Sequence, residues 1–307
     1  MILCAGEALI DMLPRRTESG EAAYAPYPGG AVFNTAVALG RLGADTGFYA
    51  GLSDDLFGES LASALAASNV DASLCPVAAR PCTMAYVHLV DGQARYMFYD
   101  ENTAGRMLTP EALPDLPDQV AALFFGGISL ISEPCGSAYE ALMTREAPAR
   151  VTMIDPNIRA SFVKDEQAYR ARIARMVAQA DIVKLSDEDL HWLEGDGDIA
   201  AKAQGLLAKG PSLVCITEGA KGATGFTASH QISVPAKSVE VADTVGAGDT
   251  FNAGLLAALQ SAGALNKSAI SALSDEVLHA ALSLGIHAAA VTVSRAGANP
   301  PWASELA

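Results

Sequence analysis

Short apolar runs rich in β-branched residues alternate with longer stretches of helical period along most of the chain. The runs predicted as buried strands are Met1–Ala5, Thr46–Ala50, Leu123–Phe125, Val151–Ile154, Ile182–Leu185 and Leu213–Thr217. The stretches predicted as helices are Ala31–Arg41, Leu56–Ala67, Gly136–Arg145, Glu166–Ala178, Ala200–Ala208, Ala247–Ala262 and Asp275–Val291. This alternation predicts a mostly parallel sheet covered by helices on both faces. Ligands of such folds bind beyond the carboxyl ends of the strands, so the residues after each strand are examined for chemistry.

Composition excludes several classes of protein. With 50% hydrophobic and 18% charged side chains among 307 residues, the chain is not expected to be disordered. Its net charge of −15 repels phosphate backbones and anionic lipid, so we expect no nucleic-acid or membrane partner. The five cysteines lack metal-binding spacing and are expected to be buried and reduced. No secretory signal is recognisable and no apolar run approaches about 20 residues, which predicts a cytoplasmic protein.

Two segments interrupt the alternation of strands and helices. Thr83–Val90 and Ala94–Tyr99 flank Asp91-Gly92, a dipeptide suited to a type I′ turn, and predict a hairpin. Residues 11–28 are predicted to be extended. A small antiparallel β lid that projects from the main sheet would include both segments. The aromatic residues expected on its apolar face are Tyr86, Phe98 and Tyr99.

A glycine-rich turn, Asp243-Thr244-Val245-Gly246-Ala247-Gly248-Asp249, leads directly into an apolar helix. Unpaired amides and the positive end of the helix dipole make such a helix start an anion site. A carboxylate in the first turn, Asp249, suits a general base that accepts a hydroxyl proton during phosphoryl transfer. The alternative is that Asp249 caps the helix, and for this motif alone capping is the favoured interpretation.

A second glycine cluster, Pro28-Gly29-Gly30, precedes the predicted helix Ala31–Arg41. Asn34 is a polar residue in the first turn of this otherwise apolar helix. Its side chain either bonds to the local backbone or presents a donor and an acceptor to vicinal hydroxyls of a ligand.

Together the two glycine-rich segments resemble the paired signatures of the ribokinase (PfkB) family of carbohydrate kinases. Two signatures in this order, roughly 200 residues apart, are far more specific than either alone. The resemblance covers essentially the whole chain and implies a single ribokinase-like domain over residues 1–307. The implied fold is a three-layer α/β/α sandwich with a discontinuous lid at about 11–28 and 83–104. Segments similar to the bacterial fructokinase branch are Gly6–Asp11, Asp155–Arg159, Lys184–Leu190 and Ala290–Ala298.

The resemblance also implies roles for individual residues. Asp249 would take the proton from the attacking sugar hydroxyl, and the amides of Gly246, Ala247 and Gly248 would bind the transferring phosphoryl group. The implied sugar ligands are Asp11, Gly29, Gly30, Asn34, Asn157 and Arg159. The implied nucleotide ligands are Lys184, Ser186, Thr217, Gly219, Gly222 and Asn252. Two of these residues have an alternative interpretation, because Asp11 could terminate a strand and Arg159 could be a solvated surface arginine.

The implied metals are Mg²⁺ and a monovalent cation, K⁺. The family often carries an N-x-x-E motif that organises magnesium through water, and here the matching positions run from Ser186 to Asp189. Asp189 retains a shorter carboxylate, so we expect it to act on Mg²⁺ through water. Alternatively Ser186 caps a helix with Asp189 in its first turn, and both interpretations are compatible. The contacts implied for the monovalent cation are Asp243, Val245 and Gly297.

The implied reaction is ATP-dependent phosphorylation of D-fructose at its 6-hydroxyl, giving fructose 6-phosphate and ADP. One alternative substrate is 2-keto-3-deoxygluconate, whose carboxylate needs further cationic partners, for which Arg159, Arg95 and Arg106 are candidates. The other alternative, a non-catalytic sugar-binding regulator, is disfavoured by the intact segment from Gly246 to Asp249. Closure of the lid would exclude water, and a lid with one apolar face could pair with its twin in a homodimer.

Overall fold

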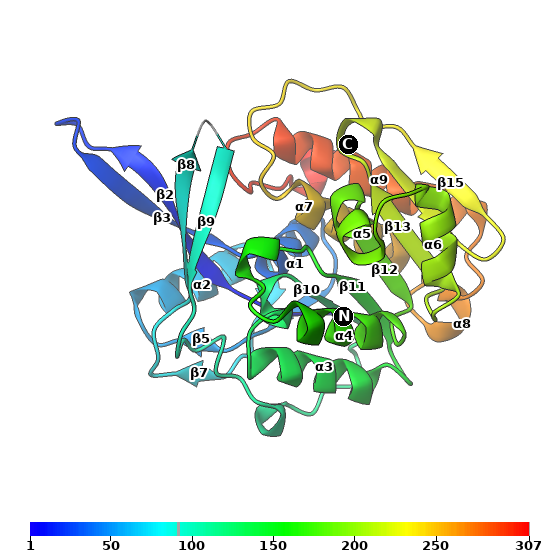
Figure 1. The fold of residues 1–307 in the computed structure, drawn as a ribbon, viewed down its shortest axis with the longest axis horizontal. Coiled ribbons are helices and arrows are strands. Elements are labelled where there is room, and N and C mark those ends of the chain that lie inside the picture. The colour runs from blue at the N-terminus through cyan, green and yellow to red at the C-terminus, as the bar shows by residue number, and fades with distance from the viewer. Residues whose placement is uncertain (91–92, 307) are drawn as a thin grey trace.

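A nine-stranded sheet forms the centre of the computed structural model, which describes residues 1–90 and 93–306 (Figure 1). The strand order is β15-β14-β13-β12-β11-β10-β1-β4-β6, and all neighbours from β13 to β6 are parallel. The strands are β1 (Ile2–Ala5), β4 (Thr46–Tyr49), β6 (Val70–Asp71), β10 (Ala122–Gly126), β11 (Val151–Asp155), β12 (Ile182–Ser186), β13 (Leu213–Thr217), β14 (Ala223–Phe226) and β15 (Gln231–Val234).

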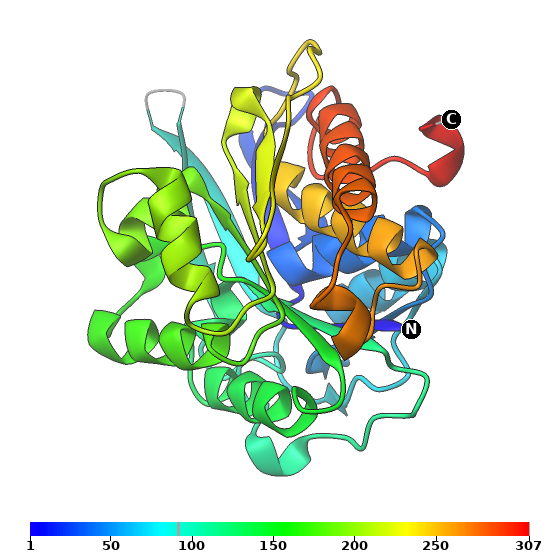
Figure 2. The ribbon, with the colours of Figure 1, turned by 90° about the vertical axis from the view of Figure 1, so that its right-hand side faces the viewer.

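Helices cover both faces of this sheet (Figure 2). One layer contains α1 (Ala31–Arg41), α2 (Leu56–Ala67), α7 (Ala247–Ser261), α8 (Lys267–Ile270) and α9 (Asp275–Val293). The other layer contains α3 (Cys135–Glu146), α4 (Glu166–Val177), α5 (Asp187–Glu194) and α6 (Ile199–Leu207). Short 3₁₀ turns lie at η1 (Pro110–Ala112), η2 (Ile128–Leu130), η3 (Ala160–Phe162), η4 (Gly219–Lys221) and η5 (Ala303–Glu305). The two layers create two hydrophobic cores, because the apolar strands bury side chains on both faces.

The predicted three-layer, mostly parallel α/β fold is confirmed. Every predicted strand and helix is present, and α1, α2 and β13 have the predicted bounds. The sequence did not predict β14 and β15, the antiparallel strands at one edge. Neither strand contains a continuous apolar run, so the hydrophobic pattern does not identify them.

Helix α9 corrects the expectation that no apolar segment is long enough to cross a membrane. It has 19 residues and meets that criterion by length and composition. In the structure α9 packs along α7, and a Cβ on Gly254 of α7 would meet the backbone of Gly285. The apolar side chains of α9 therefore pack in the core that this helix shares with α1 and α7, where Leu278, Ala281 and Leu282 are buried.

A small sheet projects from the body of the molecule (Figure 1). Its strands are β2 (Leu9–Arg16), β3 (Ala22–Gly29), β8 (Met84–Val90) and β9 (Gln93–Tyr99), in the order β3-β2-β8-β9. Two antiparallel hairpins, β2–β3 and β8–β9, meet through a parallel pairing of β2 with β8. The predicted turn at Asp91-Gly92 lies outside the described residues. A separate pair, β5 (Leu52–Ser53) and β7 (Val77–Ala78), is parallel.

Candidate active site

A cavity of about 520 Å³ opens at the carboxyl ends of the central strands. Because β12 ends at Ser186 and β13 at Thr217, the parallel sheet delivers these residues to one edge, where the first turn of α7 also lies. Most of the predicted site residues line the cavity: Asp11, Gly30, Asn34, Asn157, Arg159, Lys184, Ser186, Asp189, Thr217, Gly219, Val245, Gly246, Ala247, Gly248 and Asp249.

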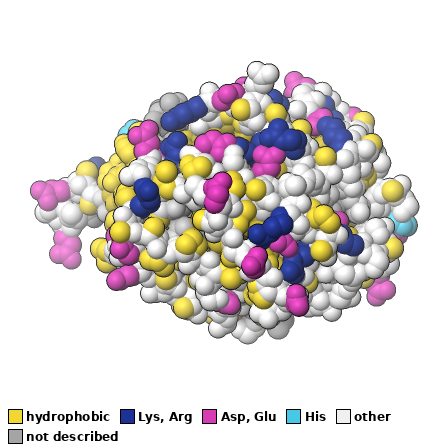
Figure 3. Space-filling view, turned by 90° about the horizontal axis from the view of Figure 1, so that it is seen from below, with side chains coloured by type: hydrophobic (Ala, Val, Ile, Leu, Met, Phe, Trp, Pro, Cys, Tyr) yellow, Lys and Arg dark blue, Asp and Glu magenta, His cyan; other side chains and the backbone are white. Residues whose placement is uncertain are grey.

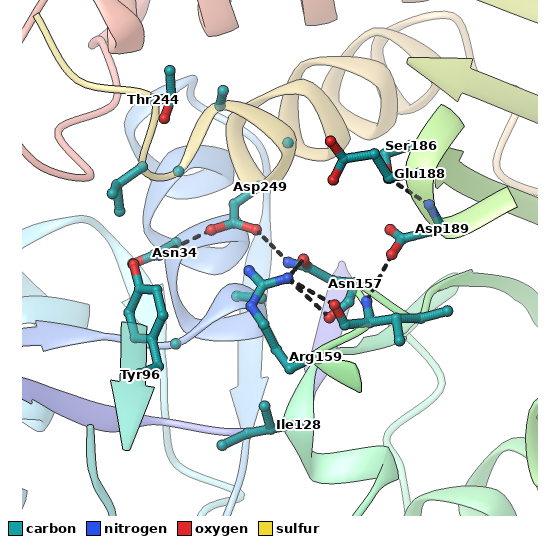
Figure 4. Close-up of a pocket in the computed structure, with 18 of the residues that line it drawn as sticks. Asn34, Tyr96, Ile128, Asn157, Arg159, Ser186, Glu188, Asp189, Thr244 and Asp249 are labelled. Atoms are coloured by element: carbon teal, nitrogen blue, oxygen red, sulfur yellow. Dashed lines mark hydrogen bonds between the residues drawn. The ribbon is translucent and has the colours of Figure 1, made fainter. Parts of the chain in front are cut away.

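Asp249 lies at the centre of the cavity and is only 6% exposed. Asn34 on α1 donates from Nδ2 to Asp249 Oδ2 over 2.9 Å, and Asn157 Nδ2 donates to Oδ1 over 3.3 Å. Figure 4 shows the two amides reaching the carboxylate from opposite sides. Helix α7 has Gly246 as its N-cap and no side-chain cap, so the interpretation that Asp249 caps the helix is wrong. The Asn34 side chain bonds to Asp249 on a distant helix, so the interpretation of a bond to the local backbone is wrong as well.

Burial dominates the electrostatics of this carboxylate. It raises the pKa of Asp249 to about 7, since the ionised form loses contact with water. The hydrogen bond from Asn34 lowers the pKa, the charge of Asp155 raises it, and Lys184 and Arg159 lower it. A carboxylate with a pKa near neutrality is suited to accept a proton at physiological pH.

The start of α7 presents backbone amides next to Asp249. Gly246 has a φ of 78°, a left-handed conformation, and the helix begins at Ala247. Without a capping side chain, first-turn amides remain for a ligand, although the Ala247 amide also makes a long 3.4 Å bond to the carbonyl of Thr244. Gly248 leaves room for the ammonium group of Lys184, because a Cβ at this position would lie 3.1 Å from Lys184 Nζ. Amides and a nearby ammonium group together favour a negative charge at this point.

The loop after β11 brings two predicted residues to the cavity. Asn157 has a φ of 42°, a left-handed conformation that asparagine tolerates better than most residues. Arg159 Nη1 donates to Asn157 Oδ1 over 2.7 Å, and this bond orients the amide that contacts Asp249 (Figure 4). Arg159 is half-buried and lines the cavity, so the interpretation as a solvated surface arginine is wrong.

Asp11 lies within β2 of the small sheet, so the interpretation that it terminates a strand is wrong. Burial raises the pKa of Asp11 to about 6, and the positive charge of Arg159 partly opposes this shift. Gly29 on the adjacent strand does not line the cavity. It leaves space for the Asp11 carboxylate, because a Cβ at Gly29 would overlap Asp11 Oδ2.

Four further predicted residues, Asn252, Gly222, Asp243 and Gly297, lie outside the cavity wall. Asn252 is 1% exposed and donates from Nδ2 to Asp155 Oδ2 over 2.7 Å, so it lies beneath the site rather than against a nucleotide base. Gly222 has a φ of 109° and packs against the carbonyl of Val234, which makes it a turn residue between β13 and β14. Both expected nucleotide contacts are thus corrected. The remaining two, Asp243 and Gly297, are hydrogen-bonded to each other.

Glu7 is a cavity residue to which the sequence assigned no role. Its Oε1 accepts from the Ala31 amide at the start of α1 over 2.9 Å, and its Oε2 accepts from the Ser129 amide over 3.2 Å. Burial raises the pKa of Glu7, while these hydrogen bonds counteract the shift. Its position two residues after the end of the buried strand β1 was the available signal, since polar residues at strand ends often belong to sites.

The small sheet contributes Tyr96 and Phe98 to the cavity. The expectation that Tyr86 and Tyr99 share the face of Phe98 is wrong, because successive side chains of a strand point to opposite faces. Tyr86 and Tyr99 contact each other on the other face, with ring centroids 5.4 Å apart.

The residues expected to contact metal ions lie in two places, Asp189 at the cavity and the others around Asp243. Among the described residues, no group of three His, Cys, Asp or Glu side chains is placed to hold a metal by itself. Asp189 lines the cavity. Ser186 caps α5, because its Oγ accepts a hydrogen bond from the backbone amide of Asp189, and the capping interpretation is therefore confirmed. Asp243 accepts from the amides of Val245 at 3.0 Å and Gly297 at 2.9 Å, which brings the three expected cation contacts together.

A buried network lies below the cavity. Asp155 Oδ2 accepts hydrogen bonds from Lys184 Nζ over 2.9 Å and from Asn252 Nδ2. Its Oδ1 accepts from the backbone amide of Asn157 over 3.2 Å. Burial alone would lower the pKa of Lys184, but the charge and hydrogen bond of Asp155 outweigh it and raise the pKa. The ammonium group beneath Gly248 is therefore held in its charged form.

A small projecting sheet beside an uncapped helix start that carries a buried carboxylate, at the edge of a parallel sheet, defines a kinase of the ribokinase-like class. The family model described as "pfkB family carbohydrate kinase" matches residues 1–305. The chain belongs to this family and is a carbohydrate kinase.

Named relatives make the similarity more specific. The chain is 56% identical over 278 residues to a fructokinase of Rhizobium leguminosarum bv. trifolii, covering 91% of this chain and 85% of the relative. A fructokinase of Xylella fastidiosa with bound ATP superposes with a TM-score of 0.91 at 28% identity, covering 99% and 96% of the two chains. A double mutant of the Vibrio cholerae fructokinase, bound to fructose, ADP and potassium, gives 0.83 at 26% identity, covering 97% and 93%.

Proposed function

We propose that this kinase transfers the γ-phosphoryl group of ATP to the 6-hydroxyl of D-fructose, giving fructose 6-phosphate and ADP. One observation carries the proposal: the Asp249 carboxylate is held by Asn34 and Asn157 directly beside the first-turn amides of α7. A proton acceptor and an anion-binding surface are thus adjacent, as phosphoryl transfer to an alcohol requires. The strong similarity to the Rhizobium fructokinase supports fructose as the sugar.

In the proposed mechanism Asp249 accepts the proton of the attacking hydroxyl. The amides of Gly246, Ala247 and Gly248, with Lys184 below them, stabilise the negative charge that develops on the transferring group. ATP would supply the phosphoryl group, with its phosphates at the start of α7 and its nucleoside near Ser186, Thr217 and Gly219. Arg159 lies on the sugar side of Asp249, where it orients Asn157 and would neutralise charge during transfer.

Charge at the sugar end of the cavity favours a neutral sugar over a sugar acid. Glu7, Asp11 and Asp249 all line this end, and a substrate carboxylate would meet like charges. Arg106, a candidate partner for an acid, is paired instead with Asp100 at 2.8 Å. The side chain of Arg95, the other candidate, lies outside the described residues. Arg159 remains as the cation on this side, so a fructose-like polyol is the better match.

The metals of this proposal are Mg²⁺ and K⁺. Mg²⁺ keeps several waters and usually needs only one or two carboxylates besides substrate phosphates, so the single carboxylate of Asp189 is sufficient. Mg²⁺ would neutralise phosphate charge. The potassium reported with the Vibrio cholerae fructokinase supports a K⁺ site at Asp243, Val245 and Gly297.

The proposal also covers the arrangement of the whole molecule. Residues 1–307 would act as a single cytoplasmic domain, with a lid at about 11–28 and 83–104 that closes over the sugar and excludes water. Tyr24, Met97 and Tyr99 expose apolar surface on the small sheet away from the cavity. Figure 3 shows hydrophobic side chains on the side from which this sheet projects. These features favour a homodimer formed through the lid. The strongly negative net charge favours neither nucleic acid nor anionic membrane as a partner.

A coupled assay of ADP release over a panel of free sugars and sugar acids tests the proposal. The panel contains fructose, ribose, glucose and 2-keto-3-deoxygluconate, each with MgATP. We expect the highest kcat/KM with fructose. Activity confined to the acid would overturn the choice of fructose, and tight sugar binding without turnover of any compound would favour the regulator.

A further inference from the structure

We propose that Asp155 is a positioning residue, which joins the sugar-side loop at Asn157 to the phosphate-side groups Lys184 and Asn252 at one point beneath Asp249. The inference rests on the proposed kinase reaction. Asp155 itself is 1% exposed and does not line the cavity, so it cannot act by touching substrate.

The two oxygens of Asp155 serve the two halves of the site separately. Oδ1 accepts from the Asn157 amide, and that residue donates from its side chain to Asp249. Oδ2 accepts from Lys184 Nζ, the ammonium below the anion-binding backbone amides, and from the side-chain Nδ2 of Asn252. A change at Asp155 therefore displaces the Asn157 loop relative to Lys184 and to helix α7, which carries both Asp249 and the phosphate amides.

Asn252 gives this junction a direct connection to the base. It lies three positions after Asp249 on α7, so the bond from Asn252 to Asp155 fixes the first turn of the helix against β11. The other side-chain atom of Asn252, Oδ1, is buried and without a hydrogen-bond partner. A buried polar atom is left unsatisfied here while Nδ2 is directed at Asp155, which indicates that this contact determines the orientation of the amide.

Charge gives Asp155 an effect that a purely structural residue would lack. Of the charged groups that act on Asp249, Asp155 on β11 raises its pKa, whereas Lys184 on β12 and Arg159 after β11 lower it. The other titratable groups that face the cavity are Glu7, Asp11, Tyr96, Asp187, Glu188 and Asp189. Removal of the Asp155 charge should therefore lower the pKa of Asp249.

The variant Asp155→Asn tests the inference. We expect kcat for the best sugar to fall by about 10²-fold, the loss typical of a small displacement of catalytic groups. We also expect the acid limb of kcat/KM to move to lower pH. The pKa of the Asp249 carboxyl, measured by ¹³C NMR in the free protein and assigned with Asp249→Asn, should shift the same way without any substrate present.

A second variant keeps the test decisive if Asp155→Asn fails to fold. Asp155→Asn combined with Lys184→Met removes both charges, and no unpaired ammonium group is left in the interior. Here kcat should remain low, but the pKa of Asp249 should return toward its parental value, because one charge that raises it and one that lowers it are both gone.

Asp181→Asn is the matched control. Asp181 also accepts from a lysine and a backbone amide, Lys267 Nζ and Thr152 N, each at 2.7 Å, but it precedes β12 at the opposite end of these strands. We expect it to lower thermal stability without changing kcat or the acid limb. The inference is overturned if Asp155→Asn keeps the parental kcat and Asp249 pKa, or if Asp181→Asn alters both equally. If the parent phosphorylates none of the sugars, the proposed function fails, and the NMR measurement still decides the role of Asp155.

Discussion

Asn34 Nδ2 and Asp249 Oδ2 are joined by a 2.9 Å hydrogen bond across 215 positions of the chain. The bond connects the first turn of α1 with the first turn of α7, and Thr35 on α1 strengthens the junction by donating to the backbone carbonyl of Asp249 over 3.2 Å. The two glycine-rich segments of the sequence are thereby united in one site, with the carboxylate held at their meeting point.

Replacement of the proposed base, Asp249→Asn, should reduce turnover by about 10²–10⁴-fold, the usual contribution of general base catalysis. ADP affinity, measured by calorimetry, should stay within a few-fold, because the amides that bind phosphate are unchanged. Turnover at the parental rate would show that another group accepts the proton, and an equal loss of ADP affinity would indicate a structural role.

The pH dependence should follow the raised pKa of Asp249. Since the base must be ionised, kcat/KM should fall about tenfold per pH unit below about pH 7. Protonation of Asp11 should make the decline steeper below about pH 6. The folded protein binds the Asp249 proton more tightly than the unfolded chain, so the contribution of this group to stability decreases as the pH rises from 3.8 to about 7. A pH profile that is flat from pH 5 to 8 would contradict this assignment.

Arg159→Gln should move the acid limb to higher pH, opposite to the shift expected for Asp155→Asn. The positive charge of Arg159 lowers the pKa of both Asp249 and Asp11, and the amide lacks that charge. Turnover should also fall, because the orientation of Asn157 is lost. Pre-steady-state and steady-state rates across pH 5–9 measure both effects, and an unchanged acid limb would place Arg159 too far from the base to matter.

Gly246→Ala should destabilise the protein and impair turnover. The left-handed backbone at this position costs an alanine about 1–2 kcal/mol, and its Cβ would lie 2.9 Å from the Cβ of Ala298. Gly263→Ala is the control, since its φ is 66° but no atom lies within 4 Å of the added methyl group. Thermal unfolding should show a larger loss for Gly246→Ala, and only this variant should lose activity. Equal losses would mean that the contact with Ala298 relaxes freely.

Tyr99→Glu should dissociate the proposed homodimer. Tyr99 is 58% exposed on the face of the small sheet that is turned away from the cavity. Burial of an unpaired charge at this position in a dimer interface is energetically unfavourable. Val241→Glu, at an equally exposed valine on the loop before α7, is the control and should leave the mass unchanged. Light scattering coupled to gel filtration measures both. A parent that is monomeric at micromolar concentration would exclude the lid dimer.

Much of the fold could be predicted from local sequence. The buried runs of the central strands and the period of α1, α2 and α7 are properties of short windows, so their positions were confirmed. The edge strands β14 and β15 were missed because neither contains a continuous apolar run like those of the central strands. The faces of the small sheet were misjudged because Phe98 and Tyr99 are successive residues of β9 and point to opposite faces. The register Met84↔Tyr99 then places Tyr86 on the face of Tyr99.

The sequence by itself determined the order of the elements and the two glycine-rich segments, because helix starts, turns and strand periods depend on near neighbours. Only the tertiary structure decided that Asn34 and Asn157 both donate hydrogen bonds to Asp249. The same is true of the buried hydrogen bond from Asn252 to Asp155 and of the bond by which Glu7 accepts from the first amide of α1. The physical reason is that burial and long-range hydrogen bonds depend on which strand ends meet at the sheet edge. That meeting is a result of the packing of the whole chain rather than of any one segment.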